Sequence, residues 1–235
     1  TNKATITNTD VTAAASNAAA FNTTNGTNLT PAITFGTGAE TLTIGTAGHE
    51  LNSTISGAGG ADTLSAVTGV DFSTAASVAD FETLVIADGG AVTMTGAQHA
   101  GFSTAISGGG SETINLSGAS TLTGAAAIEN YVLGSTASSF TLGAVGQSVT
   151  GGAGNDTVNV GTNTTTGALD GAGGTDTMIL GTGANISGST ISNFENLEIA
   201  TGGTVTMTEG QFESFTGTIT AAGAETLILS ANTGG

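Results

Sequence analysis

The chain has 235 residues, including 39 Gly, 9 Phe and 1 Pro, and it contains neither Trp nor Cys. Lys3 is its only lysine or arginine, against 18 acidic residues, which gives a net charge of -17. This composition excludes disulfides and thiolate metal sites. It argues against nucleic acid and membranes as partners, because the chain repels anionic surfaces and has no long apolar run.

The N-terminal segment, residues 1–35, begins with the strand-like sequence "TNKATITNTDV" and includes "VTAAASNAAAF" at 11–21, the only stretch with a weak helical pattern. It lacks the basic start and apolar run of a secretory signal peptide. We expect residues 1–35 to supply a strand for assembly and residues 36–235 to form a separate repeat domain.

Short strands follow one another from residue 36 onward, and many begin just after an acidic residue. They alternate apolar with small polar residues, as in "TLTI", "TINL", "TVNV" and "TLIL", which predicts one face turned into a core. Glycine-rich turns separate them. The acidic positions are Glu40, Asp62, Glu82, Glu112, Glu129, Asp156, Asp176, Glu195 and Glu225.

A larger repeat is also present, because residues 55–117 resemble residues 169–230. "GAGGAD" recurs as "GAGGTD", "DFETLVI" as "NFENLEI" and "VTMTGAQHAGF" as "VTMTEGQFESF", each with an offset of 113 or 114 residues. A strand-turn unit of about ten residues buries its inward side chains only by stacking on its neighbours. We therefore predict an all-β β-solenoid of the parallel β-helix or β-roll kind. An antiparallel sandwich is the alternative, but it gives no reason for the recurring acid.

The stretch "GGAGNDTVN", residues 151–159, resembles the Gly-Gly-x-Gly-x-Asp-x-apolar-x repeat of RTX, or haemolysin-type, calcium-binding proteins. The other turns keep only part of that pattern, in the style of bacterial surface-layer proteins and large adhesins. The resemblance implies that Asp156 binds calcium together with the carbonyl groups of Gly152 and Gly154. By the same resemblance the metal ligands include Asp170, Gly174, Asp176, Gly60 and Asp62.

A second interpretation of these aspartates is that each carboxylate accepts hydrogen bonds from the amides of its glycine turn. Both interpretations stay open for Asp62, Asp156 and Asp176. Glu82, Glu129 and Glu195 are expected at solvated strand edges. His49 and His99 are isolated in the sequence, and neither is expected to bind a metal or act as a base. The repeated phenylalanines, together with Met94 and Met207, are expected in the core.

The residue inventory argues against an enzyme, because the chain offers no arginine, one lysine, one tyrosine and two scattered histidines. We expect a secreted structural protein of the bacterial cell surface, with calcium as cofactor, that polymerises head to tail into a surface layer or fibre. A monomeric adhesin or glycan-binding module, with cell-surface polysaccharide as partner, is the first alternative. A non-catalytic RTX domain of a secreted enzyme is the second. The Thr-x-Thr runs suggest a fourth hypothesis, an ice-binding face.

Overall fold

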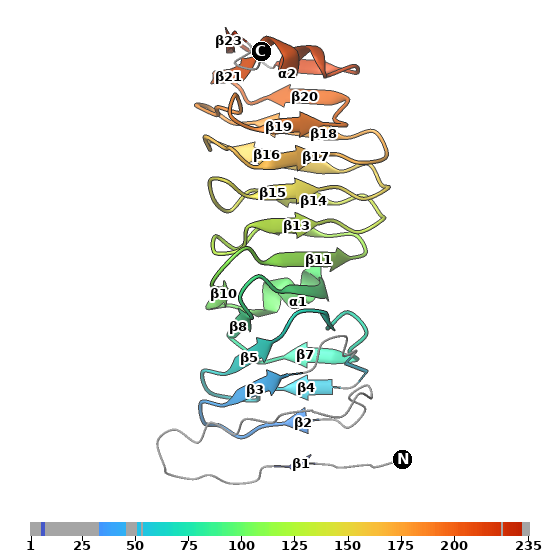
Figure 1. Cartoon of the computed structure of the whole chain (residues 1–235), viewed down its shortest axis with the longest axis vertical. Coiled ribbons are helices and arrows are strands. Elements are labelled where there is room, and N and C mark those ends of the chain that lie inside the picture. Colours follow the sequence, from blue (N-terminus) through green and yellow to red (C-terminus); the bar gives the residue numbers. More distant parts are fainter. Residues whose placement is uncertain (1–5, 8–32, 46–50, 53, 222, 232–235) are drawn as a thin grey trace. The chain divides into compact units, whose positions relative to one another are not determined.

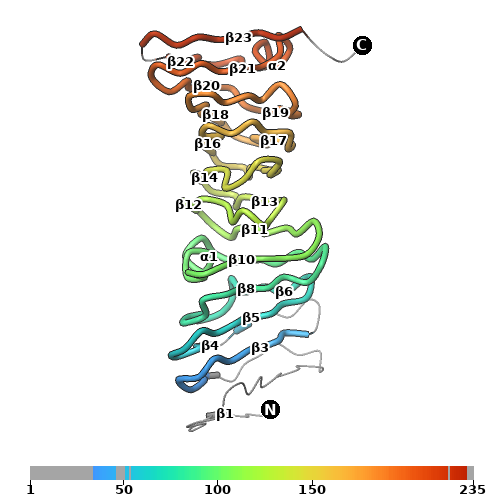
Figure 2. The backbone as a smooth tube through the Cα atoms, turned by 90° about the vertical axis from the view of Figure 1, so that its left-hand side faces the viewer, coloured from blue at the N-terminus to red at the C-terminus, as the bar shows by residue number. Residues whose placement is uncertain are grey.

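The structure, a computed structural model, describes residues 6–7, 33–45, 51–52, 54–221 and 223–231. The chain divides into two compact units, Thr1–Asn115 and Leu116–Gly235. Within each unit, parallel strands wind into stacked coils, as Figures 1 and 2 show, and the predicted all-β solenoid is confirmed. The stretch 11–21, which has the weak helical pattern, and most of the segment 1–35 lie outside the described residues.

The described strands of the first unit lie in three parallel sheets. One sheet has the order β1 (Ile6–Thr7), β2 (Ile33–Thr34), β4 (Thr54–Ser56), β7 (Ser77–Ala79). The second has the order β10 (Ala105–Ser107), β8 (Thr83–Ile86), β5 (Thr63–Ala66), β3 (Thr41–Ile44). In the third, β6 (Val70–Asp71) pairs with β9 (Ala91–Thr95), and β11 (Thr113–Ser117) crosses the boundary between the units.

The second unit repeats this arrangement. One sheet contains β13 (Asn130–Val132), β15 (Ser148–Thr150), β17 (Ala168–Asp170) and β19 (Thr190–Ser192). The next has the order β12 (Thr121–Thr123), β14 (Ser139–Thr141), β16 (Thr157–Gly161), β18 (Thr177–Leu180), β20 (Asn196–Ile199), β22 (Ile219–Ala221). The last pairs β21 (Thr204–Thr208) with β23 (Thr226–Ser230).

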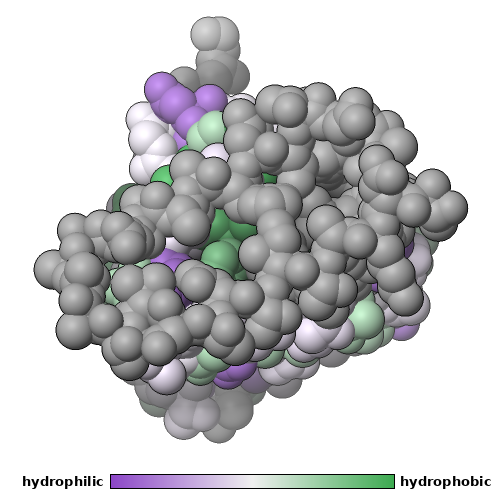
Figure 3. All heavy atoms as spheres, turned by 90° about the horizontal axis from the view of Figure 1, so that it is seen from below, coloured by the Kyte–Doolittle hydropathy of each residue, from purple (hydrophilic) through white to green (hydrophobic). Residues whose placement is uncertain are grey.

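The core of each unit is a set of apolar columns that run from coil to coil. Leu42, Leu64 and Leu84 stand in register in the first unit, and Val158, Met178 and Leu197 do so in the second. All six side chains are at most 1% exposed. In the view of Figure 3, hydrophobic residues of the first unit are visible near the centre. The alternating burial predicted from sequence is thus confirmed.

The predicted core residues are also in place. Met94 and Met207 are fully buried. The repeated phenylalanines are at most 9% exposed; they are Phe72, Phe81, Phe102, Phe194 and Phe215. The outward-facing positions are more varied, since Thr43 is in register with Ser65 and then with Val85.

Among the described residues, two short helices interrupt the strands, α1 (Gly96–Gly101) and α2 (Glu209–Glu213), and the sequence analysis did not anticipate them. Each begins with a capping box, in which the Thr95 or Thr208 hydroxyl accepts the backbone N–H of a glutamine three residues later. Both helices follow the "VTMT" strand of a duplicated block. The duplication therefore repeats the helix as well as the strands.

Candidate functional site

A column of carboxylates stands at one corner of each unit, at the start of successive strands of one sheet. We call it the carboxylate ladder, and its members are Glu40, Asp62 and Glu82 in the first unit and Asp156, Asp176 and Glu195 in the second. Every ladder carboxylate except Glu40 accepts the backbone N–H of the residue that occupies its place one coil earlier. Asp62 Oδ1 accepts Glu40 N at 2.7 Å, and Glu82 Oε2 accepts Asp62 N at 2.7 Å.

The second unit has the same connections. Asp176 Oδ1 accepts Asp156 N at 2.6 Å, and Glu195 Oε2 accepts Asp176 N at 2.7 Å. Asp156 Oδ1 in turn accepts Ser138 N at 2.7 Å. Ser138 continues the column with a hydroxyl in place of a carboxylate, because its Oγ accepts Ser120 N at 3.2 Å. The ladder therefore joins coil to coil through side chains, in addition to the backbone pairing of the strands.

The ladder aspartates are almost completely removed from solvent: Asp62 and Asp156 are 1% exposed and Asp176 is fully buried. Three ladder oxygens are buried without a hydrogen-bond partner in the structure, namely Glu40 Oε2, Asp62 Oδ2 and Asp176 Oδ2. Burial raises the pKa of Asp62 from 3.8 to about 6, and the negative charges of Glu40 and Glu82 act in the same direction. The pKa of Asp176 is raised for the same leading reason, with Asp156, Glu195 and Asp170 adding to it.

The glycines of the turn make room for this burial. A Cβ atom on Gly171 would lie 2.7 Å from Asp176 Oδ2 and would overlap the carbonyl oxygen of Asn193 in the next coil. Gly174 has φ +130°, a conformation that residues with a side chain rarely adopt. The "GAGGTD" pattern is therefore the sequence of a turn that folds its own carboxylate inward while the next coil packs directly against it.

Among the residues expected to bind calcium, Asp156 already uses both of its carboxylate oxygens, whereas Asp62 and Asp176 each keep one oxygen without a hydrogen-bond partner. Asp156 Oδ2 accepts Gly152 N at 2.8 Å while its Oδ1 accepts Ser138 N, so both carboxylate oxygens hold backbone N–H groups. The Gly152 carbonyl accepts Gly173 N of the next coil at 2.9 Å. These contacts do not fit an ion held by Asp156 and the Gly152 carbonyl.

The remaining predicted ligands have other neighbours. A side chain on Gly154 would overlap Ala137 N, and one on Gly60, where φ is +145°, would overlap the Gly38 carbonyl. Among the described residues, His, Asp and Glu side chains form no group of three that is placed to hold a metal ion. Calcium binding by the chain stays a prediction.

Asp170 takes part in a different contact, next to the ladder. Its Oδ1 accepts Asn193 Nδ2 at 2.7 Å and Ala172 N at 3.0 Å. At the corresponding positions of the first copy, Ser56 Oγ donates to Asp80 Oδ2 at 2.7 Å. In the first copy the acid, Asp80, lies in the later coil, whereas in the second copy the acid, Asp170, lies in the earlier coil. Each pair keeps one carboxylate and one hydrogen-bond donor.

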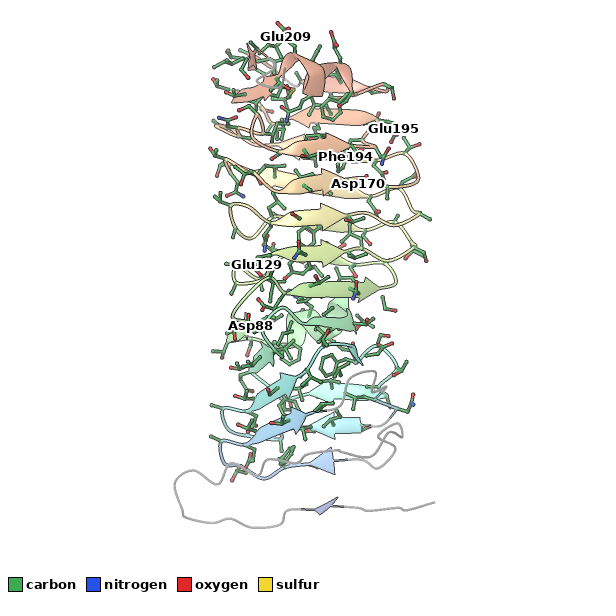
Figure 4. The ribbon with its side chains drawn as sticks, viewed as in Figure 1. Asp88, Glu129, Asp170, Phe194, Glu195 and Glu209 are labelled. Carbon is green, nitrogen blue, oxygen red and sulfur yellow. The ribbon has the colours of Figure 1, made fainter. Side chains whose placement is uncertain are left out.

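Two expectations for the glutamates need correction, those for Glu82 and Glu195, whereas the expectation for Glu129 stays a prediction. Glu82 and Glu195 are half-buried ladder members and not solvated strand edges, because each accepts the backbone N–H of an aspartate. Glu129 precedes β13 on a different sheet, and Figure 4 shows it on the opposite side of the second unit from Asp170 and Glu195. The nine recurring acids are therefore not one series, since Glu112, Glu129 and Glu225 lie outside the ladder.

Glu112 and Glu225 bind the amides of glycine turns. Glu112 Oε1 accepts N–H groups from Gly89, Gly109 and Gly110 at 2.8 to 3.2 Å. Glu225 accepts Gly202 N and Gly223 N through its two oxygens. For these two residues the interpretation as turn acceptors describes the contacts seen.

The histidine and tyrosine lie in buried surroundings. His99 in α1 is 8% exposed, and burial lowers its pKa from 6.5 to about 4, so the ring is neutral near pH 7. Tyr131 packs against Phe140, and its hydroxyl accepts Ala125 N at 2.7 Å. His49 lies outside the described residues.

The sequence analysis missed three glutamines that connect loops. Gln147 is 2% exposed; its Oε1 accepts Gly143 N, and its Nε2 donates to the carbonyls of Ala125 and Ile128. Gln98 and Gln211 occupy the capping boxes and donate to carbonyls of earlier coils. The Thr-x-x-Gln spacing is a known helix-start signal and could have identified the last two. Nothing in the local sequence marks Gln147.

The fold and its ladder define the chain as a parallel β-solenoid protein with side-chain connections between coils. No family model, curated protein or solved structure matches the chain. In the described part of the chain, no helix has the length and apolar character needed to cross a membrane.

Proposed function

We propose that the chain is a non-catalytic structural protein of the bacterial cell surface, exported from the cell, whose solenoid units associate end to end into a surface layer or fibre. The observation that supports this proposal is the exposed apolar surface of the coil formed by β21, β22 and β23. In the described part of the chain, β22 and β23 are the outermost strands of their sheets.

The duplication shows that this surface consists of core positions. Ile219 and Leu229 correspond, at an offset of 113 residues, to Ile106 and Leu116. The side chains of the first copy are 7% and 4% exposed, whereas those of the second are 40% and 44% exposed. The same positions of the repeat are therefore buried in the first block and exposed in the second. A further coil stacked on β22 and β23 would bury them.

We propose that a second copy of this chain supplies such a coil. An open strand edge pairs most readily with another strand of matching register and side-chain pattern, and the chain consists of such strands. Burial of Ile219 and Leu229 supplies the apolar contact. We therefore take end-to-end self-association as the function that the geometry supports best.

Calcium has a secondary place in this proposal. Each chain carries a net charge of -17, so two chains repel one another in solution. Exposed carboxylates such as Glu198, Glu209 and Glu213 offer the oxygen ligands that calcium prefers. Ions that bridge such groups between copies would reduce the repulsion. The buried ladder takes no part in this bridging.

Sedimentation and electron microscopy of the purified chain test the proposal, with and without calcium. The variant Leu229→Lys places a charge on the end surface and should weaken association by at least about tenfold, equal to about 1.4 kcal/mol. Val145→Lys is the matched control, since Val145 is 63% exposed in a loop of the same unit and should leave association unchanged.

A wild-type chain that stays monomeric at high concentration in both calcium and chelator would refute self-association. Equal effects of the Leu229→Lys and Val145→Lys substitutions would refute the role of the end surface. Association that does not change on chelation would remove calcium from the proposal and leave the end-to-end contact in place.

A further inference from the structure

The strands that open each unit correspond to one another. By the offset of the duplication, β4 corresponds to β17 and β7 to β19. The strand order extends this correspondence, because β4 follows β1 and β2 in its sheet just as β17 follows β13 and β15. The two columns in register are Ile6, Ile33 and Ile55, and Tyr131, Val149 and Leu169. In the first unit, β1 is therefore the counterpart of β13.

The strands that close the duplicated blocks, β11 and β23, also correspond, at an offset of 113 residues. After β11 the sheet continues, because β13 stands next to β11 in the strand order. Leu116 of β11, which belongs to the second unit together with β13, is 4% exposed. After β23 the described residues supply no further strand, and Leu229, at the position of Leu116, is 44% exposed. Within the described part of the chain, β23 thus lacks the neighbour that β13 provides for β11.

We propose that the neighbour of β23 is β1 of a second chain, which joins it as a parallel strand in the way that β13 joins β11. This inference rests on the self-association proposed above and specifies its contact. Among the described strands, β1 pairs on one side only, with β2. Its other edge offers backbone N–H and C=O groups to a strand of another chain. The contact between two chains then repeats a strand order that the chain already contains.

The distribution of charge favours this contact. Lys3, the only lysine or arginine, lies three residues before Ile6 in β1, whereas Glu225 directly precedes β23. Residues that precede two paired parallel strands lie at the same end of the pair. The contact therefore brings the one basic side chain of the second chain towards an acidic end of the first. A tail-to-tail contact, in which two C-terminal coils meet, would instead bring the acids of both coils together.

The contact also determines how the assembly grows. It is heterologous, because the β23 edge of one chain meets the β1 edge of another. Each added chain offers a new β23 edge, so the series grows as an open filament. A tail-to-tail contact would use up both β23 edges and stop at two chains. The proposal therefore predicts filaments and not closed dimers.

Single cysteines test the contact, because the chain contains no cysteine of its own. Neighbouring strands lie about 4.8 Å apart, within the Cα separation of about 4.4–6.8 Å that a disulfide spans. Thr7→Cys labels β1 at the position in register with Thr34 and Ser56. Ile228→Cys and Thr226→Cys label β23 at two exposed positions on the same side of the strand.

The β1 variant is mixed with one β23 variant and oxidised, so that every disulfide between the two kinds of chain joins separate molecules. Thr7→Cys mixed with Ile228→Cys, or with Thr226→Cys, should give a covalent dimer that contains one chain of each kind, identified by mass spectrometry. Neither variant should form a covalent dimer when it is oxidised alone. Val145→Cys is the control partner for Thr7→Cys, since it places an exposed cysteine in a loop away from β23 and should give no dimer.

A second pair of variants tests the role of charge without cysteines. Lys3→Gln and Val145→Glu each make the net charge more negative by one unit. If Lys3 lies at the contact, Lys3→Gln should weaken association about two- to fivefold at low salt, and more than Val145→Glu does. The difference between the two variants should disappear at about 1 M salt, where exposed charges are screened. Sedimentation measures both effects, and it decides the proposal if the cysteine variants fail to associate as the wild type does.

Two results would overturn the proposal while leaving self-association in place. One is a wild type that associates while Ile228→Cys or Thr226→Cys oxidised alone gives covalent dimers as efficiently as the mixtures do, since two C-terminal ends would then meet. The other is association with no disulfide between Thr7→Cys and either β23 position, together with equal effects of Lys3→Gln and Val145→Glu. A wild type that stays monomeric would refute the proposed self-association itself, and this contact with it.

Discussion

Asp156 shows how one ladder residue connects three segments of chain. It accepts N–H groups from Ser138 in the preceding coil and Gly152 in its own turn, and its backbone N–H is held by Asp176. Hydrogen bonds to a charged acceptor in a buried place each contribute about 1.5–3 kcal/mol. Asp156 therefore stabilises its own turn and also connects that turn to the neighbouring coils.

Replacing Asp156 by alanine leaves the buried N–H of Ser138 and the part-buried N–H of Gly152 without their acceptor. We expect a loss of about 2–5 kcal/mol in the free energy of unfolding, measured by urea denaturation at neutral pH. Asp156→Asn keeps one acceptor oxygen and should lose less. Equal losses in the two variants would show that packing, and not hydrogen bonding, determines the effect.

His99 makes the stability of the protein depend on pH, because burial lowers its pKa in the folded state. Because its pKa in the folded protein is about 4, against 6.5 when unfolded, the unfolded chain binds a proton first as the pH falls. Stability should therefore decrease between pH 6.5 and pH 4 by up to about 3 kcal/mol.

The variant His99→Phe tests this effect, since Phe212 occupies the corresponding place in α2. The acid-side loss attributable to His99 should disappear, as measured by the difference in thermal stability between wild type and variant at each pH. An unchanged pH profile would mean that His99 is accessible enough to titrate normally in the folded state.

At the residue scale, the positions of the turns could be predicted from the sequence, but the direction in which their carboxylates point could not. Glycines at fixed spacing before Asp62, Asp156 and Asp176 predicted close turns, and the turns are present. Their carboxylates point into the stack because the backbone N–H of the preceding coil lies within reach. That donor is about 20 residues away, as the separation between Asp156 and Asp176 shows, so no local pattern reveals it.

The two helices illustrate the element scale, because each is held by a single glutamine. Gln211 accepts Thr208 N at 2.8 Å and donates to the carbonyls of Ile186 and Ser189 at 2.7 and 2.8 Å. A helix of five residues does not form without such contacts. We infer that Gln211 both begins α2 and attaches it to the coil beneath.

Gln211→Glu tests this double role, because a carboxylate can still accept from Thr208 but has no amide to donate to the two carbonyls. A loss of about 2–4 kcal/mol in unfolding free energy is expected. Hydrogen exchange of the α2 amides should accelerate at the same time. Glu213→Gln, an exposed change in the same helix, is the control and should alter neither measurement.

Strands could be predicted from sequence more reliably than helices. Alternation of apolar and polar residues over four or five positions is a local signal, and strands such as Thr177–Leu180 follow it. The sequence alone did not show which acids belong to the ladder, because this assignment depends on the number of residues in each coil. One coil spans 20 residues between Thr157 and Thr177, whereas the interval from Glu82 to Glu112 crosses to another sheet.

For the whole molecule, the solenoid predicts that coils are interchangeable when their length is kept. Thr157 pairs with Thr177, so removal of residues 157–176 joins Asp156 directly to Thr177 and deletes one complete coil of the second unit. Each coil contacts mainly its neighbours, and the ladder would close again. We expect a folded protein, with the β-sheet circular dichroism of the parent and moderately lower stability.

Deletion of residues 162–176 removes three quarters of that coil and shifts every later strand out of register. This protein should fail to fold or lose the second unit. Similar circular dichroism and cooperativity for the two deletions would contradict the assignment of the coil.

The exchanged acid and donor beside the ladder have a consequence for recombination between the duplicated blocks. Ser56 faces Asp80 in one block, and Asn193 faces Asp170 in the other. A chimera that placed Asp170 against Asp80 would bring two carboxylates together, and the reciprocal chimera would set Ser56 against Asn193 with no charge at all. The side chains of each coil therefore complement those of the neighbouring coil in the same block. This complementarity disfavours incorrect pairing between strands of the two blocks during folding.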